Sequence, residues 1–179
     1  MQQDLSNYLA AGKLLSEGEV NWGGNMPMKV AIYLNGTSPP LDIISSVRAI
    51  VFRQQSVLVV TQENGEMYVL PGGRVEDGES PEKTLRREML EETGWSLSNS
   101  KPFGCMYFHH LAPKPEGYRY PYPDFLWPIY IAEAGVFTPE TVIPDDYVFK
   151  SEFMPVKEVL KLKLEPSSLV LLEEAVKVH

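Results

Sequence analysis

The residues with the most obvious chemistry in this chain gather in one short acidic segment. Glu88, Glu91 and Glu92 are spaced i, i+3 and i+4, so a helix would place them on one arc of its surface. Three carboxylates at that spacing repel one another unless a cation or solvent screens their charge. A solvated acidic helix face is the ordinary explanation for such a pattern. A site for a hard divalent cation such as Mg²⁺ is the alternative, because Mg²⁺ takes carboxylate oxygens as ligands.

The elements around these glutamates are predicted to be a glycine turn followed by a capped helix. The pair Gly72-Gly73 follows a strand-like run, and glycine lets the backbone turn sharply and other groups approach it closely. Ser80 is a good N-cap and Gly94 suits the position after the last turn, so a helix is predicted over about 81–93. A glycine turn before the acidic helix, with Arg87 beside the glutamates, favours the cation site over a merely solvated face.

The full pattern from Gly73 to Trp95 resembles the Nudix box. It consists of Gly73, five residues, Glu79, seven residues and then the run REMLEETGW at 87–95, and every defining position matches, including the apolar Met89. The resemblance covers about residues 45–155 and is weak over the first forty. It implies an α/β fold, a Nudix-type α/β/α sandwich in which a mixed sheet lies between helices and the box helix packs against it.

The resemblance also implies a reaction, the hydrolysis of a diphosphate bond with the help of Mg²⁺ or, as a substitute, Mn²⁺. Glu88, Glu91 and Glu92 resemble the metal ligands of the family, and Glu91 or Glu92 could instead deprotonate the attacking water. Arg87 resembles the arginine that orients these glutamates. We expect it to pair with Glu79, because a planar guanidinium can hold two carboxylates in a fixed geometry.

Two of the box residues also have simpler explanations. Gly73 resembles the residue whose backbone carbonyl joins the metal ligands, yet it could be glycine only because the turn requires it. Glu79 could be acidic because a carboxylate near a helix N-terminus interacts favourably with the helix dipole. Either explanation is compatible with the functional role.

The composition limits the partners of this chain. Its 179 residues include 24 acidic and 16 basic side chains, for a formal charge of −8, which disfavours DNA and long RNA and leaves a small phosphorylated nucleotide as the expected substrate. The single cysteine, Cys105, is expected to fill space in the core. The first residues lack the pattern of a signal peptide and no apolar run reaches membrane-spanning length, so a cytoplasmic protein without membrane contact is expected.

The first forty residues are predicted to form an extension and residues 41–179 the Nudix domain. Leucines and a tyrosine near a helical period predict a helix over 4–17, followed by a loop over 19–26 and a strand over 28–34. This helix-plus-strand extension could cover the catalytic sheet or form a homodimer interface. The sequence leaves both roles open.

The remaining pattern alternates strands and loops and ends in helices. Pro128 lies inside a strand candidate and therefore predicts an edge strand or a bulge. The segments 114–124 and 135–146 are expected to be loops. The predicted strands are 43–52, 56–61, 67–70, 95–97, 103–111, 125–132 and 148–154, and the predicted C-terminal helices are 155–162 and 167–178.

Residues outside the box are expected to select the substrate. Arg74, Arg119 and Tyr122 are candidates for contacts with phosphate or base, although aromatic residues in a long loop also pack on a sheet for burial alone. His109 and His110 are adjacent in a strand candidate and should face opposite sides, which makes a joint role improbable. Further carboxylates that could approach the site are Asp145, Asp146 and Glu152.

Three functions are compatible with these residues. The first is hydrolysis of a small nucleoside diphosphate derivative, such as a nucleotide sugar or an ADP-ribose-like compound. The second is a nucleotide-binding regulatory module without catalysis, which need not retain all the box residues. The third is action on an RNA 5′ end, which the acidic balance and the lack of a basic run disfavour.

Overall fold

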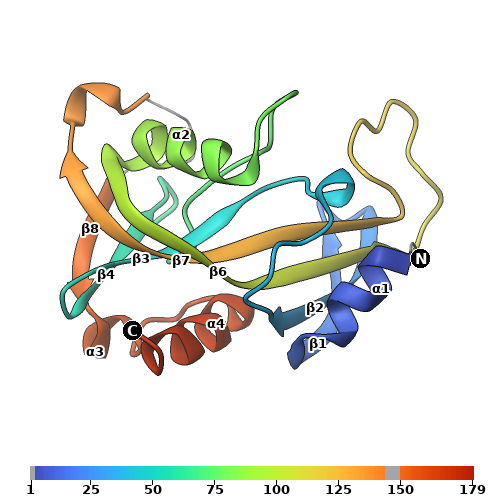
Figure 1. Ribbon diagram of the computed structural model, residues 1–179, viewed down its shortest axis with the longest axis horizontal. Helices are drawn as coiled ribbons and strands as arrows, with labels where there is room; N and C mark the ends of the chain where they lie inside the picture. The colour runs from blue at the N-terminus through green and yellow to red at the C-terminus, as the bar shows by residue number, and fades with distance from the viewer. Residues whose placement is uncertain (1–2, 144–149) are drawn as a thin grey trace.

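The computed structural model describes residues 3–143 and 150–179, and its core is a mixed sheet between two layers of helix (Figure 1). Helix α2 covers one face of the sheet and α4 covers the other. The helical elements are α1 (Gln3–Ala10), η1 (Leu41–Ile43), α2 (Pro81–Thr93), η2 (Pro139–Thr141), α3 (Val156–Val159) and α4 (Pro166–Val176). The strands are β1 (Lys13–Trp22), β2 (Met26–Leu34), β3 (Arg48–Arg53), β4 (Ser56–Thr61), β5 (Met67–Tyr68), β6 (Trp95–His110), β7 (Asp124–Phe137) and β8 (Lys150–Pro155).

The sheet has the order β1-β2-β6-β7-β3-β4-β5, and β8 pairs with β4 away from this path. All pairs are antiparallel except β3 with β7, which run parallel. Because successive side chains of a strand point to opposite faces, β3 contributes to both layers of the core. Val51 packs in the cluster below α2, and Phe52 packs in the cluster below α4. The predicted α/β/α sandwich is thereby confirmed.

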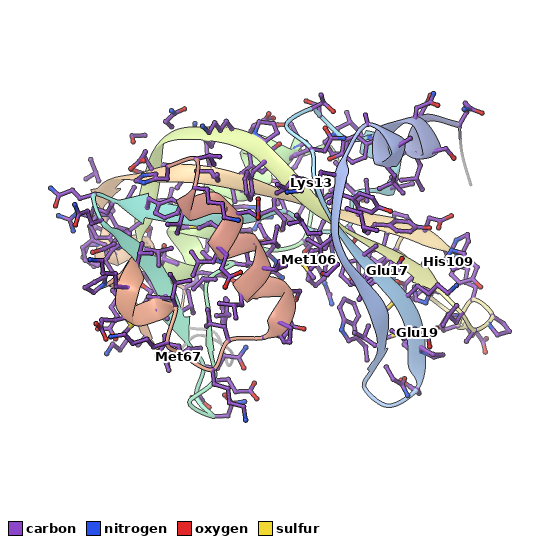
Figure 2. The ribbon with its side chains drawn as sticks, turned by 90° about the horizontal axis from the view of Figure 1, so that it is seen from below. Lys13, Glu17, Glu19, Met67, Met106 and His109 are labelled. Atoms are coloured by element: carbon purple, nitrogen blue, oxygen red, sulfur yellow. The ribbon has the colours of Figure 1, made fainter. Side chains whose placement is uncertain are left out.

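The N-terminal region differs from the sequence-based prediction. The predicted helix over 4–17 ends at Ala10, and the predicted loop over 19–26 is wrong, because 13–22 form a strand that pairs with β2 through a turn at 23–25. Leu14 and Leu15 fit a helical period, but the backbone bonds of the hairpin outweigh this local pattern. The view from the α4 side shows the hairpin beside α4, with Glu17 and Glu19 on its outer strand (Figure 2).

Strands β6 and β7 are longer and more central than predicted. The two strand candidates at 95–97 and 103–111 are one strand, β6, whose register with β7 shifts at three places. Strand β7 continues to Phe137 and lies between β6 and β3, so the expectation that Pro128 marks an edge strand is wrong. The alternative, a bulge, fits the register shift between Pro102 and Gly104 of β6, which lies next to the pair of Cys105 with Pro128. The register with β3 begins at Ile129, one residue after the proline, so Pro128 precedes this ladder and does not interrupt it.

The C-terminal elements lie close to their predicted positions. Strand β8, helix α3 and helix α4 correspond to the predictions for 148–154, 155–162 and 167–178, and α3 is shorter than expected. Leu171, Leu172 and Ala175 bury one side of α4 against the sheet. Among the described residues, no helix has the length and apolar character needed to cross a membrane.

Candidate active site

Helix α2 begins and ends as its sequence predicts, and this fixes the direction of its acidic arc. Ser80 caps the first turn and Pro81 occupies the first helical position. Gly94, with a φ of 71°, ends the helix in the left-handed conformation that glycine adopts without strain. Leu85 and Met89 are fully buried against the sheet. The adjacent arc, which carries the glutamates, is therefore turned toward the glycine turn and the box loop.

The guanidinium of Arg87 binds three glutamates at once. Its Nη2 donates to Glu79 Oε2 at 2.9 Å, and its Nη1 donates to Glu88 Oε1 and to Glu91 Oε2, each at 2.9 Å. Nη2 also donates to the carbonyl of Arg74 at 3.1 Å, which ties the helix to the loop before it. The expected pairing of Arg87 with Glu79 is confirmed. Hydrogen bonds to these carboxylates, first of all to Glu79, raise the pKa of Arg87.

Glu79 is the anchor of this arginine. Its side chain is only 6% exposed, and it accepts hydrogen bonds from Arg87 and from Thr84 Oγ1, the latter at 2.9 Å. The bonds from Arg87 and Thr84 lower the pKa of Glu79 to about 2, although burial acts in the opposite direction. Glu79 is therefore ionised at neutral pH and holds the start of the helix against the box loop.

Glu88 lies directly over the glycine turn. A Cβ atom added to Gly73 would overlap with the Glu88 carboxylate, so this close approach requires glycine at position 73. Burial raises the pKa of Glu88, while the bond from Arg87 acts in the opposite direction. The Glu88 carboxylate therefore occupies a partly desolvated position in which a nearby cation would stabilise its charge.

The glycine turn runs beside the start of β3. The N–H of Val47 donates to the carbonyl of Gly73 at 2.8 Å, and the N–H of Ala49 donates to the carbonyl of Pro71 at 3.0 Å. Peptide groups of an extended segment point alternately to its two sides. Both backbone polar groups of Gly72 consequently point away from β3 and into the site.

Gly72 uses both of these groups. Its N–H donates to Glu92 Oε2 at 2.8 Å, and its carbonyl accepts a hydrogen bond from Nη1 of Arg48. A side chain could not occupy position 72, because φ is 130° and a Cβ would overlap with the carbonyl oxygen of Val47. The turn thus holds Glu92, whereas Arg87 holds Glu88 and Glu91.

The first residue of β3, Arg48, is a site residue that the sequence did not reveal. It lies 24 positions before Gly72 and belongs to no recognisable motif. Its guanidinium is packed over the ring of Trp127, with Cζ 5.1 Å from the ring centroid. Burial lowers the pKa of Arg48, while the charges of Glu92 and Glu88 act in the opposite direction. Only the pairing of β3 with the glycine turn brings Arg48 to the site.

The three residues predicted to contact substrate lie in the box loop and in the loop between β6 and β7. Arg74 stands in the box loop with its Cζ 4.9 Å from the ring centroid of Tyr120, so the loop between β6 and β7 reaches the box. Arg119 is exposed on that same loop. Tyr122 donates its hydroxyl to the carbonyl of Ala112 at 2.7 Å, a bond within the loop. Arg74 and the β6–β7 loop are thus brought together, and Tyr122 contributes to the loop's own structure.

The two adjacent histidines have separate partners, as their strand position predicts. His109 Nδ1 lies 2.8 Å from Asp124 Oδ1, and His110 Nε2 lies 2.9 Å from the hydroxyl of Tyr118. Burial lowers the pKa of His110, and the charge of His109 adds to this effect. His110 is therefore a buried side chain that anchors the β6–β7 loop through Tyr118.

The remaining candidates do not join the acidic cluster among the described residues. Asp145 and Asp146 lie outside the residues that the structure describes. Glu152 forms an ion pair of 2.6 Å with Lys150 on β8. Cys105 is buried, and burial raises the pKa of its thiol to about 12, which fits the predicted role as a core residue.

The donor atoms of the box fit a hard divalent cation by their chemistry. Glu88, Glu91 and Glu92 supply carboxylate oxygens, and the carbonyl of Gly73 keeps a second lone pair after accepting from the backbone of β3. Within residues 3–143 and 150–179, no three acidic, histidine or cysteine side chains already surround a common point. Glu88 and Glu91 both accept hydrogen bonds from the Arg87 guanidinium.

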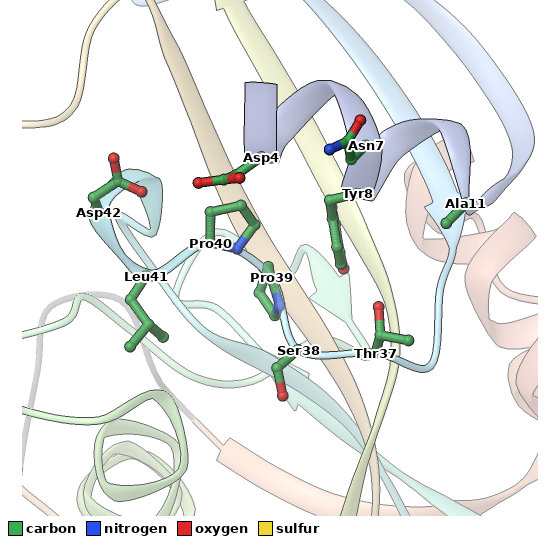
Figure 3. A pocket seen from close by; sticks show the side chains of 10 residues that line it. All are labelled: Asp4, Asn7, Tyr8, Ala11, Thr37, Ser38, Pro39, Pro40, Leu41 and Asp42. Atoms are coloured by element: carbon green, nitrogen blue, oxygen red, sulfur yellow. The ribbon is translucent and has the colours of Figure 1, made fainter. Parts of the chain in front are cut away.

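A separate open cavity of about 640 Å³ lies between α1 and the segment 37–42 (Figure 3). Asp4 and Asp42 stand at its rim, and Tyr8 and Pro39 are among its lining residues. None of the box residues lines it. The cavity is therefore distinct from the acidic cluster.

The geometry and the sequence agree on the family. A protein-family model described as NUDIX domain matches residues 43–175, which is most of the chain. The chain belongs to the Nudix family. The match begins after the segment predicted as an extension, so α1 and the β1–β2 hairpin lie outside it.

Similarity to curated proteins is concentrated in short segments. The chain is 33% identical over 76 residues to "Putative ADP-ribose pyrophosphatase YjhB" of Bacillus subtilis (strain 168), which is 42% of this chain and 36% of that protein. It is 44% identical over 50 residues to a "Putative 8-oxo-dGTP diphosphatase" of the same strain, which is 28% of this chain and 34% of that protein. The matched segments span about a third of the length of these curated relatives.

Solved structures share the fold over a longer stretch. The Bacillus subtilis pyrophosphohydrolase BsRppH superposes with a TM-score of 0.62 at 18% identity, over 90% of this chain and 96% of that one. A NUDIX hydrolase from Nitrosomonas europaea superposes with a TM-score of 0.56 at 20% identity, over 75% of this chain and 89% of that one. At these identities the comparison establishes the fold.

Proposed function

We propose that this chain is a divalent-metal-dependent pyrophosphohydrolase that cleaves the diphosphate bond of a small nucleoside diphosphate derivative. The observation that carries the proposal is the arrangement of the box glutamates around two fixed points. Arg87 holds Glu88 and Glu91, and the N–H of Gly72 holds Glu92. A regulatory module without catalysis would have no need to keep all of these residues in defined hydrogen bonds.

The proposed roles follow from what each side chain can do. Water attacks one phosphorus of the diphosphate, and the bond from that phosphorus to the bridging oxygen breaks. Glu91 or Glu92 accepts the proton of the attacking water, because an ionised carboxylate within hydrogen-bond reach of water can act as a general base. Arg87 and Glu79 fix the geometry of these carboxylates, since rotation of the box helix relative to its loop would misplace them.

Glu88, Glu91 and Glu92, together with the carbonyl of Gly73, are the residues that would hold Mg²⁺ or Mn²⁺. When bound, the cation supplies positive charge that neutralises the diphosphate oxygens as the bond breaks. The partly desolvated position of Glu88 supports this assignment, because a buried carboxylate gains more from a nearby cation than an exposed one. The lack of a Cβ at Gly73 leaves room for Glu88 beside the turn.

Small nucleotides are the proposed substrates because of both charge and relatives. Two relatives from Bacillus subtilis are named as an ADP-ribose pyrophosphatase and an 8-oxo-dGTP diphosphatase, and both names describe small nucleotides with a diphosphate bond. The formal charge of −8 disfavours long polyanions, so an RNA 5′ end is a weaker candidate. We assign Arg74 and Arg119 to phosphate contacts, since guanidinium groups bind phosphate bidentately.

A substrate panel tests this proposal. ADP-ribose, UDP-glucose, NADH and 8-oxo-dGTP would each be incubated with the protein and Mg²⁺, and the products would be separated by chromatography. We expect turnover of at least one compound at its diphosphate bond and loss of that turnover when EDTA removes the metal. Turnover that persists in EDTA would refute the metal dependence. Binding of panel compounds without any turnover would favour the regulatory module instead.

A further inference from the structure

Arg48 connects Trp127, an aromatic residue of the sheet, with Gly72, the glycine whose N–H binds the Glu92 carboxylate. Its guanidinium lies over Trp127 on one side and donates to the Gly72 carbonyl on the other. The same glycine donates its N–H to Glu92 at 2.8 Å. Because Gly72 sits between the arginine and the glutamate, a shift of its backbone changes the position of Glu92.

Trp127 is itself fixed by the surrounding structure. Its Nε1 donates to Ser45 Oγ at 3.0 Å, and the carbonyl of Ser45 accepts the N–H of Val75 in the box loop at 3.3 Å. Its ring centroid lies 4.9 Å from that of Phe108 and 5.3 Å from that of Trp22, the last residue of β1. Arg48 therefore rests on a ring that a hydrogen bond and aromatic contacts hold in place, and Ser45 connects that ring to the box loop.

The orientation of the Arg48 side chain leaves one buried nitrogen without a hydrogen bond within the described part of the chain, which lowers the stability of the fold. Its Nε is buried and has no hydrogen-bond partner among the described residues. A buried donor without a partner lowers stability, and native structures rarely keep one without a reason. The orientation that leaves Nε without a partner is the one that brings Nη1 to the Gly72 carbonyl.

We propose that Arg48 is a positioning residue for Glu92. It holds the Gly72 peptide at a fixed place, and the N–H of that peptide then sets the direction of the Glu92 carboxylate. This inference rests on the proposed function, because Glu92 matters for turnover only if the chain is a pyrophosphohydrolase. It gives Arg48, which lies outside the box, a role in orienting Glu92, and it gives Trp127 a role in supporting Arg48.

The first test compares Arg48→Met and Arg48→Lys with a matched control, using ADP-ribose and Mg²⁺ as the probe. We expect Arg48→Met to lower kcat by about 100-fold with KM changed by less than about threefold, because a small misplacement of a catalytic group costs that much in rate. Arg48→Lys should recover about tenfold of this loss, since an ammonium group can still donate to the Gly72 carbonyl. A kcat for Arg48→Met within about threefold of the wild type would overturn the proposal.

The control variant is Arg53→Met. Arg53 also stacks on a tryptophan, with Cζ 5.0 Å from the ring centroid of Trp95, but it lies at the opposite end of β3 from Arg48. We expect its kcat to stay within about threefold of the wild type. Equal losses in Arg53→Met and Arg48→Met would assign the effect to general loosening of β3 and would overturn the proposal.

A double-mutant cycle tests the path through Glu92. If Arg48 acts by placing Glu92, then Arg48→Met should cost less than about threefold in the Glu92→Gln background, because the group it positions is already disabled. Full additivity of the two losses would contradict the proposed path. Circular dichroism spectra of each variant would confirm that the fold is retained.

A substrate-independent measurement separates this inference from the proposed function. The hydrogen bond from Gly72 N–H to Glu92 should protect that amide from solvent exchange, and Arg48→Met should accelerate its exchange at least about tenfold. Arg53→Met should leave the rate unchanged. If the wild type hydrolyses no panel compound, the proposed function fails, yet the Gly72 exchange rate still decides whether Arg48 orders the turn. An unchanged rate in Arg48→Met would overturn the inference whatever the activity.

Discussion

Two arginines flank the glycine turn and show opposite electrostatic situations. Arg87 lies on the box helix, binds Glu79, Glu88 and Glu91, and has its pKa raised by these carboxylates. Arg48 lies on β3, stacks on an aromatic ring, donates to a backbone carbonyl, and has its pKa lowered by burial. The first arginine is held by charge, and the second is held by packing.

The difference shows how one acidic cluster is organised from two sides. The helix side supplies strong ion pairs between residues that are close in sequence. The sheet side supplies a side-chain hydrogen bond from Arg48 to Gly72, 24 positions away, and the N–H of this glycine donates to Glu92. The helix side therefore depends on charge, and the sheet side depends on a side chain that is packed on an aromatic ring. Variants on the two sides should therefore fail in different ways.

The largest effect is expected at Glu92, which is held by the turn. Glu92→Gln keeps the shape of the side chain but removes its capacity to accept a proton, so kcat should fall by about 10²–10⁴-fold. Steady-state kinetics with the panel compound that the wild type hydrolyses would measure this. Glu82→Gln is the control, because Glu82 is an exposed glutamate of the same helix in its first turn. Near-normal activity of Glu92→Gln would remove Glu92 from the proposed roles.

The next largest effect is expected at Arg87, on the helix side of the acidic cluster. Arg87→Met removes the guanidinium that Glu79 and Glu88 share and leaves these two carboxylates close together. The free energy of unfolding should therefore fall by about 2 kcal/mol. Turnover should fall as well, because the helix loses its bond to the box loop. Urea unfolding would measure the stability. Arg86→Met, which removes a bond from an exposed arginine of the same helix to the carbonyl of Leu97, is the control. Equal destabilisation by both variants would contradict the central role of Arg87.

A smaller effect is expected where the helix meets the turn. Gly73→Ala places a methyl group against the Glu88 carboxylate, so this carboxylate must move and kcat should fall by about tenfold. Kinetics over a range of Mg²⁺ concentrations would show whether more metal is needed for half-maximal activity. Gly18→Ala is the control, because a Cβ there meets open space. Unchanged metal dependence in Gly73→Ala would argue against a metal-ligand role for Glu88.

The smallest effect concerns the pH dependence of the Arg87 network. The pKa of Glu79 is about 2 in the folded protein against an ordinary value of 4.5, so its ionised form stabilises the fold fully above pH 4.5. That contribution should be lost as pH falls through about 2. The difference in unfolding free energy between the wild type and Glu79→Gln should shrink over this range, as measured by urea titration at several pH values. A difference that is constant with pH would show that Glu79 acts only by packing.

The sequence predicted the helix side of the site well, because its determinants are local. Ser80 and Gly94 bound the helix at its predicted ends, and the i, i+3, i+4 spacing put the glutamates on one arc. The pairing of Arg87 with Glu79 also followed from the box pattern. The α/β/α sandwich was predictable from the mixture of strands and helices and from the resemblance to the Nudix family, and Leu85 and Met89 of the box helix are buried against the sheet.

Other parts of the fold were not predictable in this way. The leucines at 14 and 15 fit a helical period, yet they lie in β1 because pairing with β2 satisfies the backbone. Pro128 suggested an edge strand or a bulge, yet β7 is central because it pairs with β6 on one side and with β3 on the other. In both cases a distant strand decided the structure, and a local pattern carries no information about which strand will be adjacent.

The sequence by itself determined the family and the acidic helix that carries Glu88, Glu91 and Glu92. The tertiary structure alone decided that Arg48 reaches Gly72, that Trp127 supports it, and that the β6–β7 loop touches Arg74. The physical reason is the range of the interactions. Helix caps and carboxylate spacing act over a few residues, whereas stacking and sheet pairing join segments whose proximity depends on the whole fold.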